Sequence, residues 1–152
     1  MASFVASPLQ ADILVTNEAG VVVAQIEVKA RFGSPQWAKA LKDALARWSA
    51  IAPSAYFVLV TKDSIYIWAP IASEESVSHP PIVLSTNAVL GKYFARVGLT
   101  PEESYEEPLI YAMSGWLRET ASNVQSGRFP IPSPELTSFA GAISGADVRL
   151  TE

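Results

Sequence analysis

The sequence predicts an α/β domain with a central mixed sheet. A β-hairpin pattern at residues 12–30 is followed by an amphipathic helical pattern and by two apolar strand patterns, at 56–60 and 65–68. A strand–helix–strand passage makes a right-handed parallel crossover, whereas hairpins pair antiparallel. We therefore expect a mixed sheet of four or five strands flanked by helices, with a helical carboxy-terminal half.

Residues 12–30 form the predicted hairpin, with strands at about 12–16 and 21–30 and a polar turn at 17–20. Successive strand residues point to opposite faces, so Glu27 and Lys29 share one face. If the turn is symmetric, Asp12 opposes Gln25 and lies on that face as well, diagonal to Glu27 and within about 7–8 Å of it. A slip of one residue would move Asp12 to the other face.

Charged side chains on an otherwise apolar strand need a partner, because an unpaired buried charge costs several kcal/mol or shifts its pKa. One interpretation is an ion pair between Glu27 and Lys29 at the sheet edge. The other is a magnesium site, since Mg²⁺ is typically held by one or two carboxylates, water and substrate phosphate. Asp12 and Glu27 would then hold the ion, and Lys29 would contact the phosphate or orient the attacking water.

The spacing of these residues resembles that of the PD-(D/E)XK nuclease superfamily. Asp12 is followed, after fourteen residues, by Glu27-Val28-Lys29, within an order of apolar strand, turn, apolar strand, amphipathic helix and apolar strand. The chain is most similar to the amino-terminal nuclease domain of type I restriction subunits, over roughly residues 8–70. The resemblance implies a restriction-endonuclease-like fold, Mg²⁺ or Mn²⁺ as cofactor, and hydrolysis of phosphodiester bonds in DNA.

The resemblance also implies roles for single residues. Asp12 and Glu27 would bind the metal ion, together with the backbone carbonyl of Val28, and Lys29 would stabilise charge at the phosphate. Gln36 begins the next helix, where related nucleases often place a glutamine or lysine near the metal. An exposed first-turn position is the alternative role for Gln36.

The sequence departs from the superfamily pattern at its start. Ala11 stands where the family often has proline, and residues 1–11 contain no acidic residue to serve as a further ligand. The alternative function is therefore a catalytically inactive module of the same fold that binds nucleic acid or a protein partner. As partners of an active enzyme we expect DNA, a second copy of the chain in a homodimer, and a larger restriction or mobile-element system.

Gly33-Ser34-Pro35 ends the hairpin and begins a helix, with Ser34 as N-cap and Pro35 at the first helical position. The helix should run to about Ile51 and cover the sheet with an apolar stripe of Trp37, Leu41, Leu45 and Trp48.

Later elements follow from similar signals. We expect a short strand at 82–84, a helix capped by Thr86 or Asn87, a capping box at Thr100–Glu103, and a long helix from about Pro108. A short helix at 136–143 and a loose segment or edge strand at 147–152 complete the chain.

Composition limits the function classes. The 152 residues, 49% of them apolar, fit one domain over 1–152, with a core at about 8–70 and a helical extension at about 85–145. The absence of cysteine excludes thiol nucleophiles and Cys-based zinc sites, and no nucleophile-elbow motif accompanies His79, the only histidine. No signal peptide or membrane-spanning run is recognisable, so we expect a cytoplasmic protein.

The net charge of −4 disfavours nucleic-acid binding, but its distribution matters. Five basic residues lie within a short stretch that begins at the candidate site: Lys29, Arg31, Lys39, Lys42 and Arg47. They form either the solvated face of a helix or a basic rim beside the metal.

Overall fold

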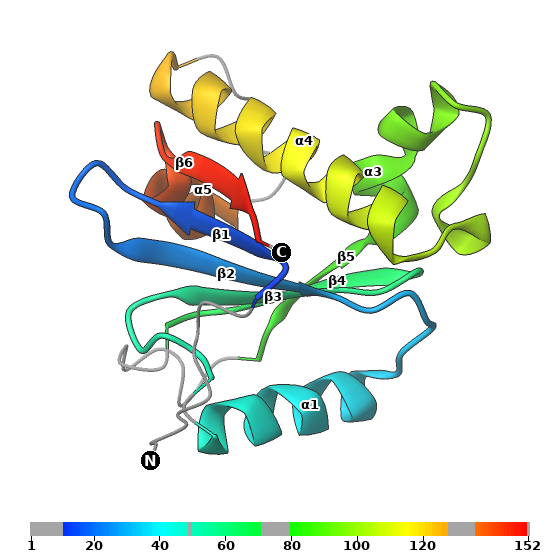
Figure 1. Ribbon diagram of the computed structural model, residues 1–152, viewed down its shortest axis with the longest axis horizontal. Coiled ribbons are helices and arrows are strands. Elements are labelled where there is room, and N and C mark those ends of the chain that lie inside the picture. The colour runs from blue at the N-terminus through cyan, green and yellow to red at the C-terminus, as the bar shows by residue number, and fades with distance from the viewer. Residues whose placement is uncertain (1–10, 49, 71–79, 128–135, 152) are drawn as a thin grey trace.

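The computed structural model describes residues 11–48, 50–70, 80–127 and 136–151. These residues fold into a six-stranded mixed sheet with the order β5-β4-β3-β2-β1-β6, covered by helices on both faces (Figure 1). The α/β prediction is confirmed. The predicted count of four or five strands is wrong, because the segment near the carboxy-terminal end pairs with β1 as a sixth strand.

The elements have the following bounds: β1 (Ile13–Thr16), β2 (Val22–Val28), α1 (Pro35–Arg47), β3 (Tyr56–Val60), β4 (Ser64–Trp68), β5 (Ile82–Ser85), α3 (Thr86–Ala95), η2 (Pro101–Glu103), α4 (Glu106–Gln125), α5 (Thr137–Ile143) and β6 (Asp147–Leu150). Among the described helices, none is both long and apolar enough to cross a membrane.

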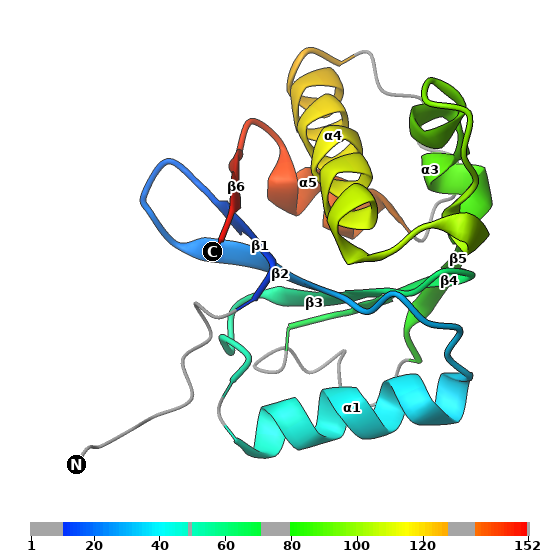
Figure 2. The same ribbon diagram turned by 45° about the vertical axis from the view of Figure 1, so that its right-hand side comes forward.

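The sheet separates two layers of helices. β2 and β3 pair in parallel through the α1 crossover, whereas the other neighbouring strands pair antiparallel. Figure 2 shows α1 alone on one face of the sheet and α3, α4 and α5 on the other. A smaller core lies under α1, and a larger core lies under the other three helices.

Alternate residues of the central strands supply the two cores. On β3, Phe57 and Leu59 face the smaller core, while Val58 and Val60 face the larger one. All four side chains are at most 1% exposed, which explains why the sequence of β3 is continuously apolar.

The start of α1 follows its local sequence, but its end does not follow the prediction. Ser34 is the N-cap, and its hydroxyl accepts a hydrogen bond from the Trp37 amide at 3.1 Å. The helix ends at Arg47, so Trp48 lies beyond the apolar stripe and is 63% exposed. The prediction that Trp48 covers the sheet is therefore wrong, and the buried Ile51, past the helix end, packs in the smaller core instead.

The start of α3 also differs from the prediction. Ser85 is the N-cap, because its side chain accepts from the Ala88 amide at 3.2 Å. Thr86 is fully buried, and its hydroxyl donates to the Thr61 carbonyl at 2.9 Å, so it is not free to cap the helix.

The capping box at Thr100–Glu103 is present, with the Glu103 carboxylate accepting from the Thr100 amide at 3.1 Å. It opens only the single turn η2, and α4 begins at Glu106, two residues before the predicted Pro108. His79 lies outside the described residues.

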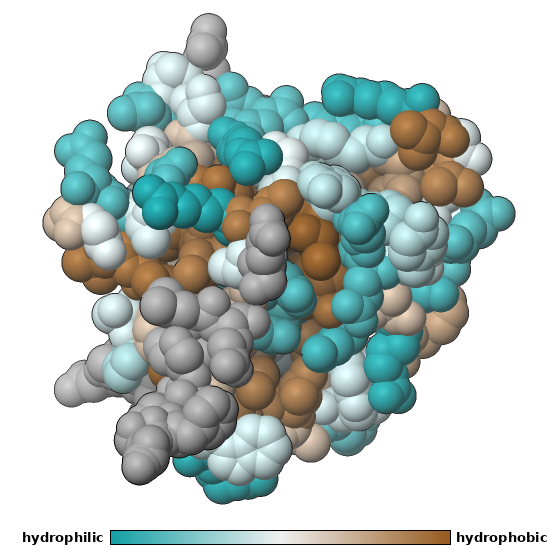
Figure 3. Space-filling model, in the orientation of Figure 1, coloured by the Kyte–Doolittle hydropathy of each residue, from teal (hydrophilic) through white to brown (hydrophobic). Residues whose placement is uncertain are grey.

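An apolar groove of about 380 Å³ lies between α3 and α4. Figure 3 shows apolar side chains gathered near the end of α3, where Val97 and Leu99 are exposed. Both helices pack on the face of the sheet opposite α1, so this groove is separate from the α1 side of the molecule.

Hydrogen bonds fix the segment between β2 and α1. The Arg31 amide donates to the Lys29 carbonyl at 2.7 Å, and the Lys62 amide donates to the Arg31 carbonyl at 2.9 Å. The Tyr66 hydroxyl, buried under α1, donates to the Gly33 carbonyl at 2.9 Å. A Cβ on Gly33 would lie 2.4 Å from the Trp37 ring, so glycine permits this close packing.

Tyr66→Phe should therefore destabilise the fold. The variant leaves the buried Gly33 carbonyl without its donor, at a cost of about 1–2 kcal/mol in the free energy of unfolding. Urea denaturation measures the change, and Tyr111→Phe, at a tyrosine that is 58% exposed, is the matched control. Equal midpoints for Tyr66→Phe and wild type would contradict this role of the hydroxyl.

Candidate metal centre on the β1–β2 hairpin

The pairing of β1 with β2 sets the position of Asp12. Ile13 pairs with Ile26 and Leu14 pairs with Gln25. The Asp12 amide donates to the Ile26 carbonyl at 3.0 Å, so the next position along β1 brings Asp12 across from Glu27.

The predicted pairing of Asp12 with Gln25 is therefore wrong by two positions. Val21 belongs to the turn, where its amide and that of Ala19 both donate to the Asn17 side chain at 3.0 Å. A register shift between Val15 and Thr16 adds the second position. Because a shift of two preserves which face a strand residue occupies, Asp12 still shares the face of Glu27.

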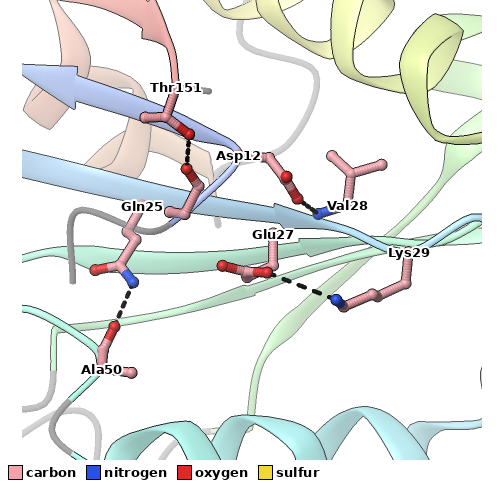
Figure 4. A network of polar contacts seen from close by, with 8 residues as sticks. Asp12, Gln25, Glu27, Val28, Lys29, Ala50 and Thr151 are labelled. Carbon is pink, nitrogen blue, oxygen red and sulfur yellow. Dashed lines mark hydrogen bonds and ion pairs between the residues drawn. The ribbon is translucent and has the colours of Figure 1, made fainter. Parts of the chain in front are cut away.

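The candidate site lies at the α1 side of the sheet, at the end of β2 (Figure 4). The Glu27 side chain is mostly buried there, with 16% of it exposed, and the Lys29 side chain is 41% exposed. The Glu27 Oε1 and Lys29 Nζ atoms are 3.9 Å apart, which is an electrostatic pair rather than a hydrogen bond. The ion-pair and metal-site interpretations of the sequence both require this proximity.

The Asp12 carboxylate is held by the end of β2. Its Oδ2 atom accepts a hydrogen bond from the Val28 amide at 2.8 Å. The Asp12 carbonyl accepts from the Thr151 amide at 3.0 Å, and the Thr151 hydroxyl donates to the Ala11 carbonyl. Val28 therefore holds the Asp12 carboxylate, and Thr151 holds the backbone that carries it.

Gln25 is a further structural residue of this face, and its role was not predicted. It is 2% exposed, its Nε2 donates to the Ala50 carbonyl at 2.6 Å, and its Oε1 accepts from the Ala52 amide at 3.1 Å. These bonds fasten the chain after α1 to the strand that carries Glu27. The sequence signal for this role was a glutamine within an apolar strand, two residues before a glutamate.

The electrostatic environment favours the protonated form of Glu27. Burial, and after it the negative charge of Asp12, raise its pKa from 4.5 to about 7, while Lys29 acts in the opposite direction. Glu106, at the start of α4, adds a smaller increase. A cation between Asp12 and Glu27 would relieve this repulsion and keep Glu27 ionised.

The donor set fits a hard divalent cation with few protein ligands. The described residues contain no group of three or more Asp, Glu, His or Cys side chains that could hold a metal. Two carboxylates completed by water, substrate and a backbone carbonyl match the usual coordination of Mg²⁺ in enzymes. Val28 directs its amide toward Asp12, and the proposed role of its carbonyl as a ligand remains a prediction.

Gln36 lies apart from these carboxylates. It is the second residue of α1 and is exposed. Among the described residues, no hydrogen bond joins Gln36 to Asp12, Glu27 or Lys29, so its position is that of a solvated first-turn residue.

The basic residues separate into two groups. On the outer surface of α1, Lys39 pairs with Asp43 at 2.8 Å, which neutralises its charge locally. At the end of β2, Lys29 and Arg31 are joined by Lys62 from the turn between β3 and β4, whose amide donates to the Arg31 carbonyl. The local sequence around Lys29 gives no sign of Lys62, because the two residues meet only through the parallel pairing of β2 and β3.

Glu27 should make stability depend on pH. The folded state holds the Glu27 proton more tightly than the unfolded state, so its contribution is complete below pH 4.5 and is lost as the pH rises through about 7. After allowance for screening of a partly exposed group, the loss is about 1–2 kcal/mol.

Glu27→Gln imitates the protonated form and should remove this dependence. In metal-free buffer the variant should be more stable than wild type at about pH 8 and similar to it at about pH 4.5. Denaturant titrations across this range give the free energy of unfolding of both proteins. The difference between the two values at each pH cancels the titration of the other groups. A constant difference at every pH would show that Glu27 does not titrate in this way.

Comparisons of the chain with protein-family models, with curated proteins and with solved structures found no match. The chemistry of the site therefore has to be argued from the placement of Asp12, Glu27 and Lys29.

Proposed function

We propose that the chain is a Mg²⁺-dependent nuclease that hydrolyses phosphodiester bonds in DNA, built on a restriction-endonuclease-like fold. One observation carries the proposal: Asp12 lies across the hairpin from Glu27, and Lys29 lies beside Glu27. Burial, and after it the charge of Asp12, raise the pKa of Glu27 to about 7. Ionised Glu27 therefore lowers the stability of the fold, and a bound cation would offset this cost.

The order of elements around the site supports the fold assignment. Asp12 directly precedes β1, Glu27 and Val28 end β2, and α1 then crosses over to β3, which pairs in parallel with β2. This is the strand, turn, strand, helix and strand order on which the resemblance to the nuclease superfamily rests.

In the proposed mechanism, each residue has a separate task. A bound divalent cation would supply an activated water and neutralise charge on the phosphate. Asp12 and Glu27 would hold it, with Asp12 kept in place by the Val28 amide at 2.8 Å. The Lys29 ammonium, which is half exposed, would contact the phosphate oxygen on which charge develops. Cleavage of both strands would take two copies, as in the expected homodimer.

A second candidate function is the inactive module that binds nucleic acid or a protein partner. It is favoured by the hydrogen bond from the Val28 amide, which already occupies one Asp12 oxygen, and by the pairing of Glu27 with Lys29. In that case the site is a polar structural element and has no reason to bind Mn²⁺.

Variants of Lys29 and Glu27 should separate cleavage from metal binding. Lys29→Ala should lower plasmid nicking at least about 100-fold while Mn²⁺ affinity stays nearly unchanged, because the lysine acts on the phosphate. Glu27→Ala should remove both properties, since it removes a metal ligand. Plasmid nicking with Mg²⁺ or Mn²⁺ and calorimetric Mn²⁺ titration measure them.

Lys92→Ala is the matched control, because Lys92 is 57% exposed on α3, on the other face of the sheet. Titrations at about pH 8 limit the indirect effect of Lys29 on the protonation of Glu27. Wild-type protein that neither cuts DNA nor binds Mn²⁺ would contradict the nuclease and favour the inactive module.

The affinity for Mn²⁺ should rise with pH. Below its pKa of about 7, Glu27 must lose a proton before it can bind the ion, so affinity should increase by up to about tenfold for each pH unit and level off above that pKa. Calorimetry in two buffers of different ionisation enthalpy counts the protons released. Affinity and proton release that do not change across this range would exclude Glu27 as a ligand.

A further inference from the structure

An exposed aromatic ring stands three residues beyond Lys29. Phe32 lies in the segment between β2 and α1, and 55% of its surface is exposed. Three residues of chain span at most about 10 Å between Cα atoms, so the segment that carries the ring adjoins the proposed site. Single exposed apolar residues are common, and the surroundings of Phe32 are what make it informative.

One cation lies beside this ring, and a second is bonded to its backbone. The Lys62 ammonium lies 5.8 Å from the centroid of the Phe32 ring. The Arg31 guanidinium lies 4.3 Å from the centroid of the Trp37 ring, and its Nε donates to the Phe32 carbonyl at 3.3 Å. Lys62, which comes from the turn between β3 and β4, thus lies beside the Phe32 ring, while Arg31 lies against the Trp37 ring and the Phe32 backbone.

The backbone that carries Phe32 is held on both sides. The Arg31 amide donates to the Lys29 carbonyl and the Lys62 amide donates to the Arg31 carbonyl, while Tyr66 binds the Gly33 carbonyl. The exposed ring is therefore presented by a fixed segment, and little further ordering is needed to stack a ligand on it.

The carboxylate of the neighbouring Asp63 is held by a hydrogen bond. Asp63, on the same turn as Lys62, accepts a hydrogen bond from the Thr61 hydroxyl at 3.0 Å. Arg31 and Lys62 therefore place two positive charges next to the segment that carries Phe32, while Lys29 is paired with Glu27. An aromatic ring bordered by cations is the combination that binds single-stranded nucleic acid, through base stacking and phosphate neutralisation.

We infer that Phe32 is a stacking platform for an unpaired base, with Arg31 and Lys62 binding the adjacent phosphates. The inference rests on the proposed function and names the substrate class of the same site: single-stranded DNA, or a duplex with an unpaired end. Bases inside a duplex stack on one another and offer no free face, so an intact blunt duplex does not use the platform.

Binding measured without metal tests this directly. Fluorescence anisotropy in EDTA at low salt compares a fluorescein-labelled single strand with a blunt duplex of the same sequence. Phe32→Ala should weaken single-strand binding by about tenfold and leave duplex binding unchanged, because one stacked base is lost. Phe32→Trp should restore it, and Lys62→Ala should weaken binding and reduce its salt dependence.

Tyr111→Ala is the matched control, since Tyr111 is an aromatic residue of α4 with 58% exposure. The inference is overturned if wild type binds no single strand, if Phe32→Ala binds it like wild type, or if both DNA forms lose affinity equally. Because EDTA removes metal, the result is independent of cleavage: a Phe32-dependent single-strand binder that never cuts DNA would refute the nuclease and keep the platform.

Discussion

A shift of one residue between β1 and β2 would send Asp12 to the face opposite Glu27 and dismantle the candidate site. The hairpin register is therefore the constraint on which the rest depends. It is fixed locally by the Asn17 side chain, which accepts two amide hydrogen bonds within the turn, and at the other end by the Val28 amide on Asp12. Apolar residues of both strands, such as Ile13 and Ile26, hold the same register because a slip of one residue would turn them out of the larger core.

This register places Asp12 across from Glu27, and both residues are partly buried. Burial and the charge of Asp12 both disfavour ionised Glu27, and Lys29 offsets only part of the cost because it is half exposed and 3.9 Å away. A protein without use for this arrangement would gain stability from an apolar residue at position 27. A carboxylate with a raised pKa beside a second carboxylate is typical of functional sites, and it is the physical argument for a bound cation.

The sequence predicts well what depends on neighbouring residues. Ser34 and Pro35 begin α1 as their types indicate, and the face shared by Asp12 and Glu27 survives an error of two positions, because strand residues alternate. Predictions fail where distant residues decide. Thr86 cannot cap α3 because its hydroxyl binds Thr61, and Trp48 lies past the end of its helix.

The same limit applies to the site. The Lys62 amide contacts the Arg31 carbonyl because β2 pairs in parallel with β3. The sequence close to Lys29 does not predict this contact. Gln25 likewise gains its role from Ala50 and Ala52, beyond the end of α1. Side chains that converge from separate elements are visible only once the topology is known.

The contact of Thr151 with Ala11 and Asp12 has a consequence for biosynthesis. β1 is an inner strand of the sheet only because β6 pairs with it, and the partners are separated by nearly the whole chain. During translation, β1 and β2 can form their hairpin early, but the outer side of β1 stays unpaired until residue 151 has left the ribosome. A nascent chain would thus carry an incompletely held Asp12 until β6 and Thr151 have been synthesised.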